Sequence, residues 1–130
     1  MNLNQITVAT HDMLQSVAFY QKLGLELIVD TPHYTRFVVP EGQATFSVSL
    51  TEEPIQSPNT TIYFECENLD AKVAELLAKG LEFSELPVDK QWLWREAHLL
   101  DPAGNIICLY YAGENRLNPP WRVGSEKQKK

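Results

Sequence analysis

The sequence is poor in basic residues, histidine and cysteine, and it contains no long apolar stretch. Its 130 residues include 2 Cys and 3 His, and 11 Lys plus Arg stand against 17 Asp plus Glu, for a net charge of −6. A phosphate backbone requires clustered lysine and arginine side chains, so the acidic balance argues against a nucleic-acid partner. No apolar stretch reaches the roughly 20 residues that cross a membrane, and the N-terminus lacks the basic flank and apolar run of a signal peptide. We therefore expect neither a nucleic-acid-binding nor a membrane protein.

The scarcity of cysteine argues against a disulfide framework. Cys66 and Cys108 both fall in strand-like segments, where buried free thiols are the commoner outcome in a reducing compartment. We expect a cytoplasmic protein. With 44% hydrophobic and 22% charged residues, the chain can form one compact domain with its own core.

The residue pattern predicts the same order of elements twice. Asp12 and Gln15 match a capping box at the start of one helix, and Gly24 suits the left-handed residue that ends it. Asn68 can cap a second helix, and Gly80 can end it. Strands are predicted at residues 3–9, 25–30, 34–39, 43–51, 60–66, 82–88, 92–100 and 105–111. Each half is therefore βαβββ, and the offset of 56 residues between Gly24 and Gly80 indicates an internal duplication.

This duplication predicts one α+β domain at residues 1–123. Its parts are module one at 3–52, a polar linker at 53–59, module two at 60–111 and a C-terminal arm at 112–123. The remaining residues, 124–130, include the only basic run and are predicted to be a disordered tail.

Two motifs give the duplicated frame a resemblance to a known family. Residues 19–25 read Phe-Tyr-Gln-Lys-Leu-Gly-Leu at the end of the first helix, and residues 101–105 read Asp-Pro-Ala-Gly-Asn before the last strand. In this order, they resemble the vicinal oxygen chelate superfamily, which includes glyoxalases, extradiol dioxygenases and bleomycin-resistance proteins. The resemblance covers roughly residues 3–111 and implies two modules that form a curved, cup-shaped mixed sheet with helices on the outside. It does not specify a function, because unrelated activities share this fold.

The resemblance also implies where a metal would be bound. Metal-dependent members hold a divalent ion with one residue from each of four strands, typically His or Gln, then Glu, His and Glu. The corresponding residues here are Gln5, Ser49 (or Ser47 after a two-residue shift), Thr61 and Cys108. Amide, hydroxyl and thiol groups lack the anionic or imidazole donors that such an ion needs. We therefore expect no family metal and no other cofactor.

Strand alternation predicts which side chains line the cup, because successive side chains point to opposite faces. Strand 92–100 leaves two alternatives open. A two-residue hairpin places Arg95 beside Tyr110 in the cup, whereas a bulge presents Trp94 and Glu96, and then His98 beside Glu96 could act as acid–base machinery. The predicted ligand-binding residues are Gln5, Thr7, Ser47, Ser49, Thr61, Tyr63, Arg95, Cys108 and Tyr110.

These residues predict a metal-free protein that holds a small organic molecule in its cup. The resemblance further implies a homodimer, to which Trp121 on the proline-rich arm could contribute. One alternative is a glyoxalase-like lyase or isomerase, or a dioxygenase-type enzyme, with an atypical metal shell or with Cys108 as nucleophile. Another is a dimerising module whose cup is filled by side chains. The sequence leaves open whether binding is followed by catalysis.

Overall fold

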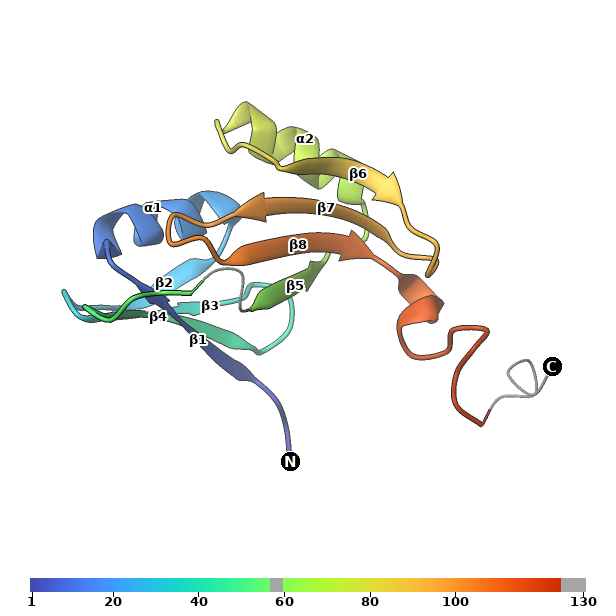
Figure 1. The fold of residues 1–130 in the computed structure, drawn as a ribbon, viewed down its shortest axis with the longest axis horizontal. Helices are drawn as coiled ribbons and strands as arrows, with labels where there is room; N and C mark the ends of the chain where they lie inside the picture. The colour runs from blue at the N-terminus through green and yellow to red at the C-terminus, as the bar shows by residue number, and fades with distance from the viewer. Residues whose placement is uncertain (57–59, 125–130) are drawn as a thin grey trace. The chain divides into compact units, whose positions relative to one another are not determined.

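The computed structural model describes residues 1–56 and 60–124 and divides into two units (Figure 1). The first contains residues 1–61 and 100–106, and the second contains residues 62–99 and the segment that starts at residue 107. Each unit has its own sheet and helix. Of the predicted linker and tail, residues 57–59 and 125–130 lie outside the described residues.

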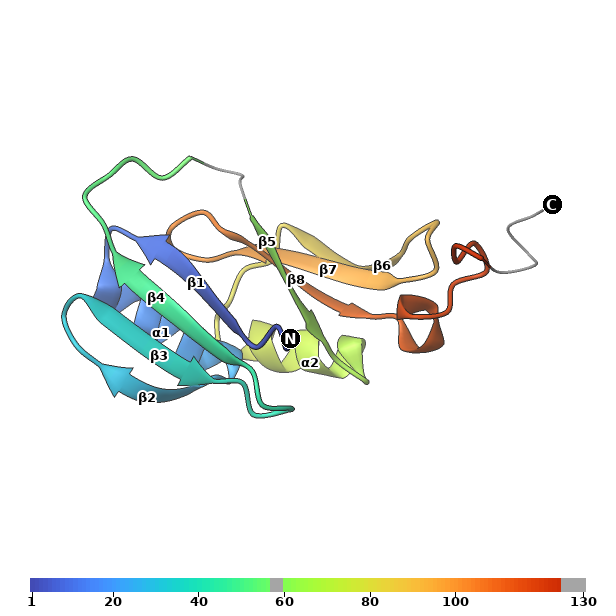
Figure 2. The ribbon, with the colours of Figure 1, turned by 90° about the horizontal axis from the view of Figure 1, so that it is seen from below.

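The first unit is built on a mixed four-stranded sheet. Its strand order is β1-β4-β3-β2, with β1 parallel to β4 and the other neighbours antiparallel (Figure 2). The elements are β1 (Gln5–Thr10), α1 (Met13–Leu23), β2 (Glu26–Asp30), β3 (Tyr34–Val38) and β4 (Thr45–Leu50).

The second sheet repeats this order as β5-β8-β7-β6. Its elements are β5 (Thr61–Glu65), α2 (Leu69–Ala78), β6 (Glu85–Asp89), β7 (Arg95–Leu100) and β8 (Ile106–Tyr111), followed by a 3-10 helix at Gly113–Arg116. The predicted α+β class with two tandem βαβββ modules is therefore confirmed. Within the described residues, neither helix has the length and apolar character needed to span a bilayer.

Both helices begin and end at the residues predicted from the sequence. The Asp12 side chain accepts a hydrogen bond from the Gln15 backbone N–H at 3.1 Å, and Asn68 caps α2 in the same way. Gly24 and Gly80 adopt φ values of 112° and 92°. An L side chain is strained in this left-handed region, which explains why glycine occupies both helix ends.

The two motifs that carry the family resemblance are in direct contact. Tyr20, at 0% exposure, packs on Phe37 and Phe46 with ring centroids 5.9 and 4.6 Å away, and its hydroxyl donates to Asp101 Oδ2 at 2.5 Å. Asp101 also accepts hydrogen bonds from the backbone N–H groups of Ala103 and Asn105, at 2.9 and 2.8 Å. One buried aspartate thus organises the turn before β8 and connects it to α1.

Strand β8 is buried on both of its faces. Ile107 and Leu109 are buried on one face, and Cys108 and Tyr110 on the other. Cys108 is a buried free thiol, as predicted, whereas Cys66 is only half-buried and is likewise outside any disulfide. The face of β8 that carries Cys108 and Tyr110 therefore forms a small cluster of its own, against which the partly buried Trp94 packs.

The turn between β7 and β8 decides which face of β7 carries which residues. The Asp101 N–H donates to the Asn105 carbonyl at 3.0 Å, so three residues separate this closing pair instead of the two of a tight hairpin. Gly104 within this turn adopts a left-handed φ of 89°. A one-residue shift exchanges the two faces of a strand, so alternation alone could not choose between them.

Candidate functional site

In the first unit, the candidate residues form a connected polar network on one face of the sheet. The Gln5 side-chain amide donates to Ser47 Oγ at 2.7 Å and to Thr7 Oγ1 at 3.2 Å. The Tyr34 hydroxyl lies 2.6 Å from the same Ser47 oxygen, and Arg36 Nε donates to Tyr34 at 3.0 Å. The sheet register produces this network, because Ser47 pairs with Thr7 on β1 and with Arg36 on β3.

Two members of this network, Tyr34 and Arg36, are not among the residues predicted from the sequence. The hydrogen bond to Ser47, and then Arg36, lower the pKa of Tyr34 below its usual range. Alternation along β3 indicates that Tyr34 and Arg36 share a face, but only the pairing with β4 shows which one. Thr45 also joins, because its hydroxyl donates to the side-chain oxygen Oε1 of Gln5. Ligand binding at the predicted residues of this sheet stays a prediction: Gln5, Thr7, Ser47 and Ser49.

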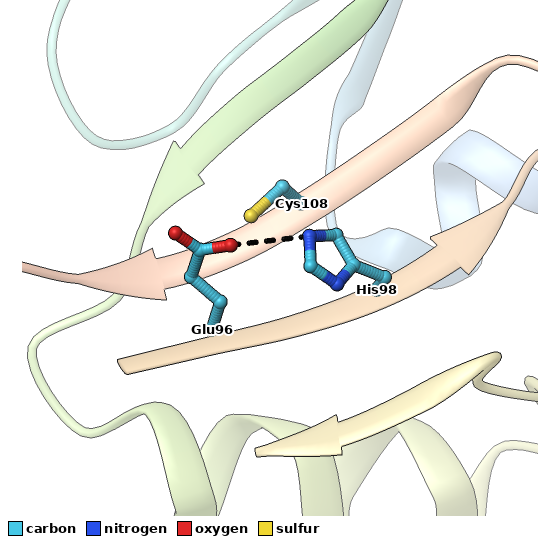
Figure 3. A group of neighbouring side chains, drawn as sticks. All are labelled: Glu96, His98 and Cys108. Atoms are coloured by element: carbon cyan, nitrogen blue, oxygen red, sulfur yellow. Dashed lines mark ion pairs between the residues drawn. The ribbon is translucent and has the colours of Figure 1, made fainter. Parts of the chain in front are cut away.

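The second unit brings together an acid, an imidazole and a thiol (Figure 3). Glu96 and His98 come from β7 and Cys108 from the neighbouring β8, and their ligand atoms all lie within 4.8 Å of one another. His98 Nε2 lies 3.2 Å from Glu96 Oε1. Glu96 is 4% exposed and Cys108 0% exposed, whereas His98 is half-buried. Among the described residues, this is the only group of three metal-ligating side chains so closely placed.

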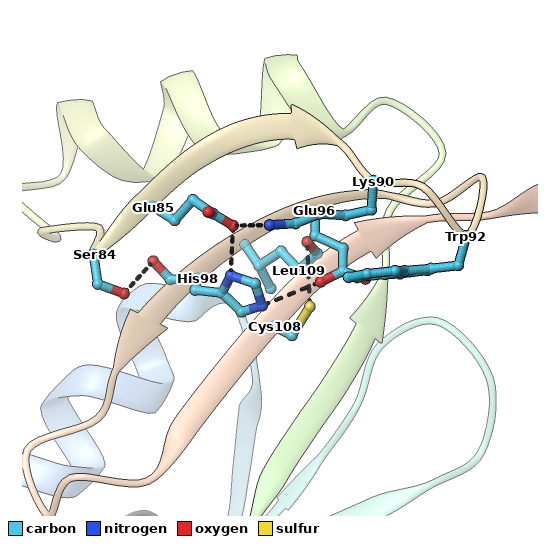
Figure 4. Close-up of polar contacts among 8 residues, drawn as sticks. All are labelled: Ser84, Glu85, Lys90, Trp92, Glu96, His98, Cys108 and Leu109. Carbon is cyan, nitrogen blue, oxygen red and sulfur yellow. Dashed lines mark hydrogen bonds and ion pairs between the residues drawn. The ribbon is translucent and has the colours of Figure 1, made fainter.

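A surrounding set of polar contacts holds these side chains (Figure 4). His98 Nδ1 lies 2.9 Å from Glu85 Oε1, and the Lys90 ammonium pairs with the same oxygen at 2.8 Å. The Trp92 indole N–H donates to Glu96 Oε2 at 2.6 Å. The imidazole is thus flanked by a carboxylate at each ring nitrogen, and both oxygens of Glu96 are engaged.

An aromatic group lies beside this cluster. Trp94 and Tyr110 are stacked, with centroids 4.5 Å apart and planes 16° apart. Tyr63 meets both rings edge-on at 6.0 and 5.7 Å and keeps 52% of its surface exposed. Burial, followed by the nearby Cys108 and Glu96, raises the pKa of Tyr63. The exposed ring of Tyr63 therefore adjoins an acidic, partly dehydrated environment.

Arg95 is not part of this group. Its guanidinium pairs with Asp70 on α2 and with Asp89 on β6, both at 3.0 Å. Arg95 therefore points toward α2, and its neighbour Glu96 points to the opposite face. The interpretation that placed Arg95 beside Tyr110 in the cup is wrong, because the turn between β7 and β8 contains three residues and not two. The alternative that presented Trp94 and Glu96 is the one observed.

The four positions implied for a family metal do not offer suitable donors. The Gln5 amide is engaged with neighbouring hydroxyl groups, Ser49 is half-buried on β4, and Thr61 is exposed at the start of β5. Burial, and then Glu96, raise the pKa of Cys108 to about 12. An amide, two hydroxyls and a single thiol provide neither a carboxylate nor an imidazole, so this donor set does not fit a divalent ion.

Several solved structures share the fold of most of the chain. A glyoxalase/bleomycin resistance protein/dioxygenase from Nocardioides superposes with a TM-score of 0.74 at 22% identity, covering 86% of this chain and 83% of that chain. A lactoylglutathione lyase from Agrobacterium tumefaciens gives 0.71 at 14% identity, covering 90% and 96%. A bleomycin-binding protein complexed with bleomycin gives 0.70 at 15% identity, covering 85% and 98%.

Sequence comparison assigns the family directly. No curated protein sequence matches the chain. The family model described as Glyoxalase/Bleomycin resistance protein/Dioxygenase superfamily matches residues 2–109, which includes both βαβββ modules except the end of β8. The chain therefore belongs to the glyoxalase/bleomycin resistance protein/dioxygenase superfamily.

Proposed function

We propose that the protein binds a small, planar organic molecule on the face of the second sheet that carries Tyr63, Trp94 and Tyr110, without the family metal. The observation that carries this proposal is a half-exposed aromatic group beside buried polar side chains. Tyr63 is 52% exposed although it contacts a stacked ring pair, so its free face can accept another ring. Such stacking contributes about 0.5–1.5 kcal/mol beyond the buried area.

The surrounding charge favours a neutral or cationic ligand over an anionic one. Glu96 is buried beside the aromatic group, and Glu85 lies next to it beyond His98. The chain as a whole carries a net charge of −6. The shared fold with a protein that binds bleomycin supports a binding role and makes bleomycin a suitable first probe.

A catalytic role is the second candidate, and the Glu96–His98 pair favours it. An imidazole beside a carboxylate can accept and return a proton during a reaction. Cys108 is a poor nucleophile by comparison, because burial raises its pKa to about 12 and leaves little thiolate near neutral pH. Turnover is detected as a change in the mass of a probe after incubation with the protein. His98→Gln should no longer cause this change.

We also propose that the protein is a cytoplasmic homodimer. The C-terminal arm supports this, because it exposes apolar side chains that a second copy could cover. Trp121 is 46% exposed and Leu117 62% exposed. The molar mass of the protein in solution tests the dimer.

The binding proposal is tested by measuring thermal stability with bleomycin, glutathione thioethers and aromatic acids as probes. A ligand at a hundred times its Kd raises the free energy of unfolding by about 2.7 kcal/mol. Tyr63→Ala should weaken binding of an active probe about tenfold, in line with one lost stacking contact. Tyr111→Ala is the matched control, because Tyr111 is 43% exposed and alternates with Tyr110 on β8. No response to any probe, or equal losses in both variants, contradicts the proposal.

A further inference from the structure

The cluster on β7 and β8 combines the three donor types that thiophilic divalent cations prefer. Cys108 offers sulfur, His98 offers nitrogen and Glu96 offers oxygen, all within 4.8 Å. Zinc binds such ligands at about 2.0–2.3 Å, so two ligand atoms on a tetrahedral ion lie about 3.3–3.7 Å apart. The separation of 3.2 Å between His98 Nε2 and Glu96 Oε1 is close to that spacing.

The hydrogen bonding of His98 leaves a place for a cation. A neutral imidazole carries one N–H, and the Glu85 carboxylate at 2.9 Å is the natural acceptor for the Nδ1 proton. In that tautomer, the Nε2 lone pair faces Glu96 Oε1 at 3.2 Å and two acceptors point toward each other. A cation between them satisfies both. A carboxylate on the remote nitrogen is also the arrangement that orients histidine ligands in metal sites.

The neighbours of Glu96 and Glu85 keep this geometry in place. The Trp92 indole binds Glu96 Oε2, which leaves Oε1 directed at His98. Lys90 pairs with Glu85 at 2.8 Å and holds it against the imidazole. A divalent ion bound by one carboxylate and one thiolate is neutralised, which matches the burial of Glu96 and Cys108.

We propose that Glu96, His98 and Cys108 form a binding site for one thiophilic divalent cation of the zinc class. Three protein ligands leave the fourth position of a tetrahedral ion to water or to a ligand atom. The site differs from the one implied by the family resemblance, since only Cys108 is common to both and the other two donors come from β7. The proposal does not depend on the organic ligand.

Cobalt(II) serves as the probe, because a thiolate ligand gives cobalt a charge-transfer absorption. Titrating chelator-treated protein with Co²⁺ should produce this band with an endpoint at one equivalent, and Zn²⁺ should abolish it by displacement. Cys108→Ser should remove the band, whereas Cys66→Ser should retain it. No band in the unsubstituted protein, or a band that depends on Cys66 instead, overturns the proposal.

Two further variants guard against loss of folding in Cys108→Ser. His98→Gln changes a half-buried side chain. Glu85→Gln changes a residue that, of the three proposed ligands, contacts only His98. Glu85→Gln should weaken Zn²⁺ binding about 10–100-fold, measured by competition with a chromophoric chelator, and His98→Gln should weaken it further. His33→Gln, in the loop before β3, should bind like the unsubstituted protein. Equal Zn²⁺ affinity in His98→Gln, Glu85→Gln and His33→Gln contradicts the metal site. That outcome does not bear on the proposed organic ligand, which the effect of Tyr63→Ala on the organic probes tests separately.

Discussion

Replacing Tyr20 with phenylalanine isolates the hydrogen bond between α1 and the turn at residues 101–105. The hydroxyl of this buried tyrosine donates to Asp101 at 2.5 Å, and the substitution retains the ring that packs on Phe37 and Phe46. A hydrogen bond to a charged group contributes about 1.5–3 kcal/mol, so Tyr20→Phe should lower the free energy of unfolding by about 2 kcal/mol at pH 7. For a chain of this length, Tm should fall by about 7 °C.

The effect of this substitution should depend on pH. Burial, and then the Asp101 carboxylate, raise the pKa of Tyr20 well above its usual range. The unfolded chain releases the tyrosine proton near pH 10, while the folded protein retains it, so unfolding becomes easier as pH rises above 10. At pH 11 this effect lowers the free energy of unfolding of the unsubstituted protein by about 1.4 kcal/mol and leaves that of Tyr20→Phe unchanged. The difference between them should therefore shrink to about 0.6 kcal/mol.

Urea unfolding followed by circular dichroism at pH 7, 10 and 11 measures this difference. Other titrating groups are present in both proteins and cancel in the comparison. Tyr111→Phe, at a residue that is 43% exposed, controls for removing a tyrosine hydroxyl elsewhere. A stability difference that stays constant from pH 7 to pH 11 refutes the reasoning, because it means that Tyr20 ionises as easily in the folded protein as in the unfolded chain.

Two further predictions concern the thiols and the C-terminal arm. At pH 8 in metal-free protein, a thiol-reactive dye should label Cys66 and leave Cys108 unlabelled until the protein unfolds. The reason is that a pKa of about 12 leaves roughly one Cys108 thiol in ten thousand ionised. Equal labelling rates of the two thiols in the native protein contradict this prediction. Trp121→Ser should lower the dimer fraction measured by light scattering, whereas Arg122→Ser on the same arm should leave it unchanged, and a monomeric unsubstituted protein contradicts the predicted dimer.

The helix ends and the duplicated module could be predicted because local chemistry determines them. A side-chain cap at Asp12 or Asn68 and a left-handed glycine at Gly24 or Gly80 each act within one turn of the chain. Their repetition at a fixed offset then indicates two equivalent modules, whatever the tertiary contacts. The contact between Tyr20 and Asp101 was not accessible in this way, because 81 residues separate the two side chains.

The face of β7 could not be predicted because it depends on a single residue of register. Asp101 and Asn105 close a three-residue turn between β7 and β8, although the same sequence is compatible with a two-residue turn. The additional residue exchanges the faces of β7 relative to β8, which directs Glu96 rather than Arg95 toward Cys108.

In both modules, the third strand contributes side chains that the family motifs do not indicate. The motifs indicate only donor positions on the first and fourth strands of each module, such as Gln5 and Cys108. In the structure, the third strand supplies the partner that gives the fourth-strand residue its chemistry. Tyr34 on β3 binds Ser47 on β4, and Glu96 on β7 adjoins Cys108 on β8. The first module thereby acquires a network of hydroxyl and amide groups, while the second acquires an acid, an imidazole and a thiol. Substitutions in β7 should therefore alter ligand or metal binding more than the matching substitutions in β3.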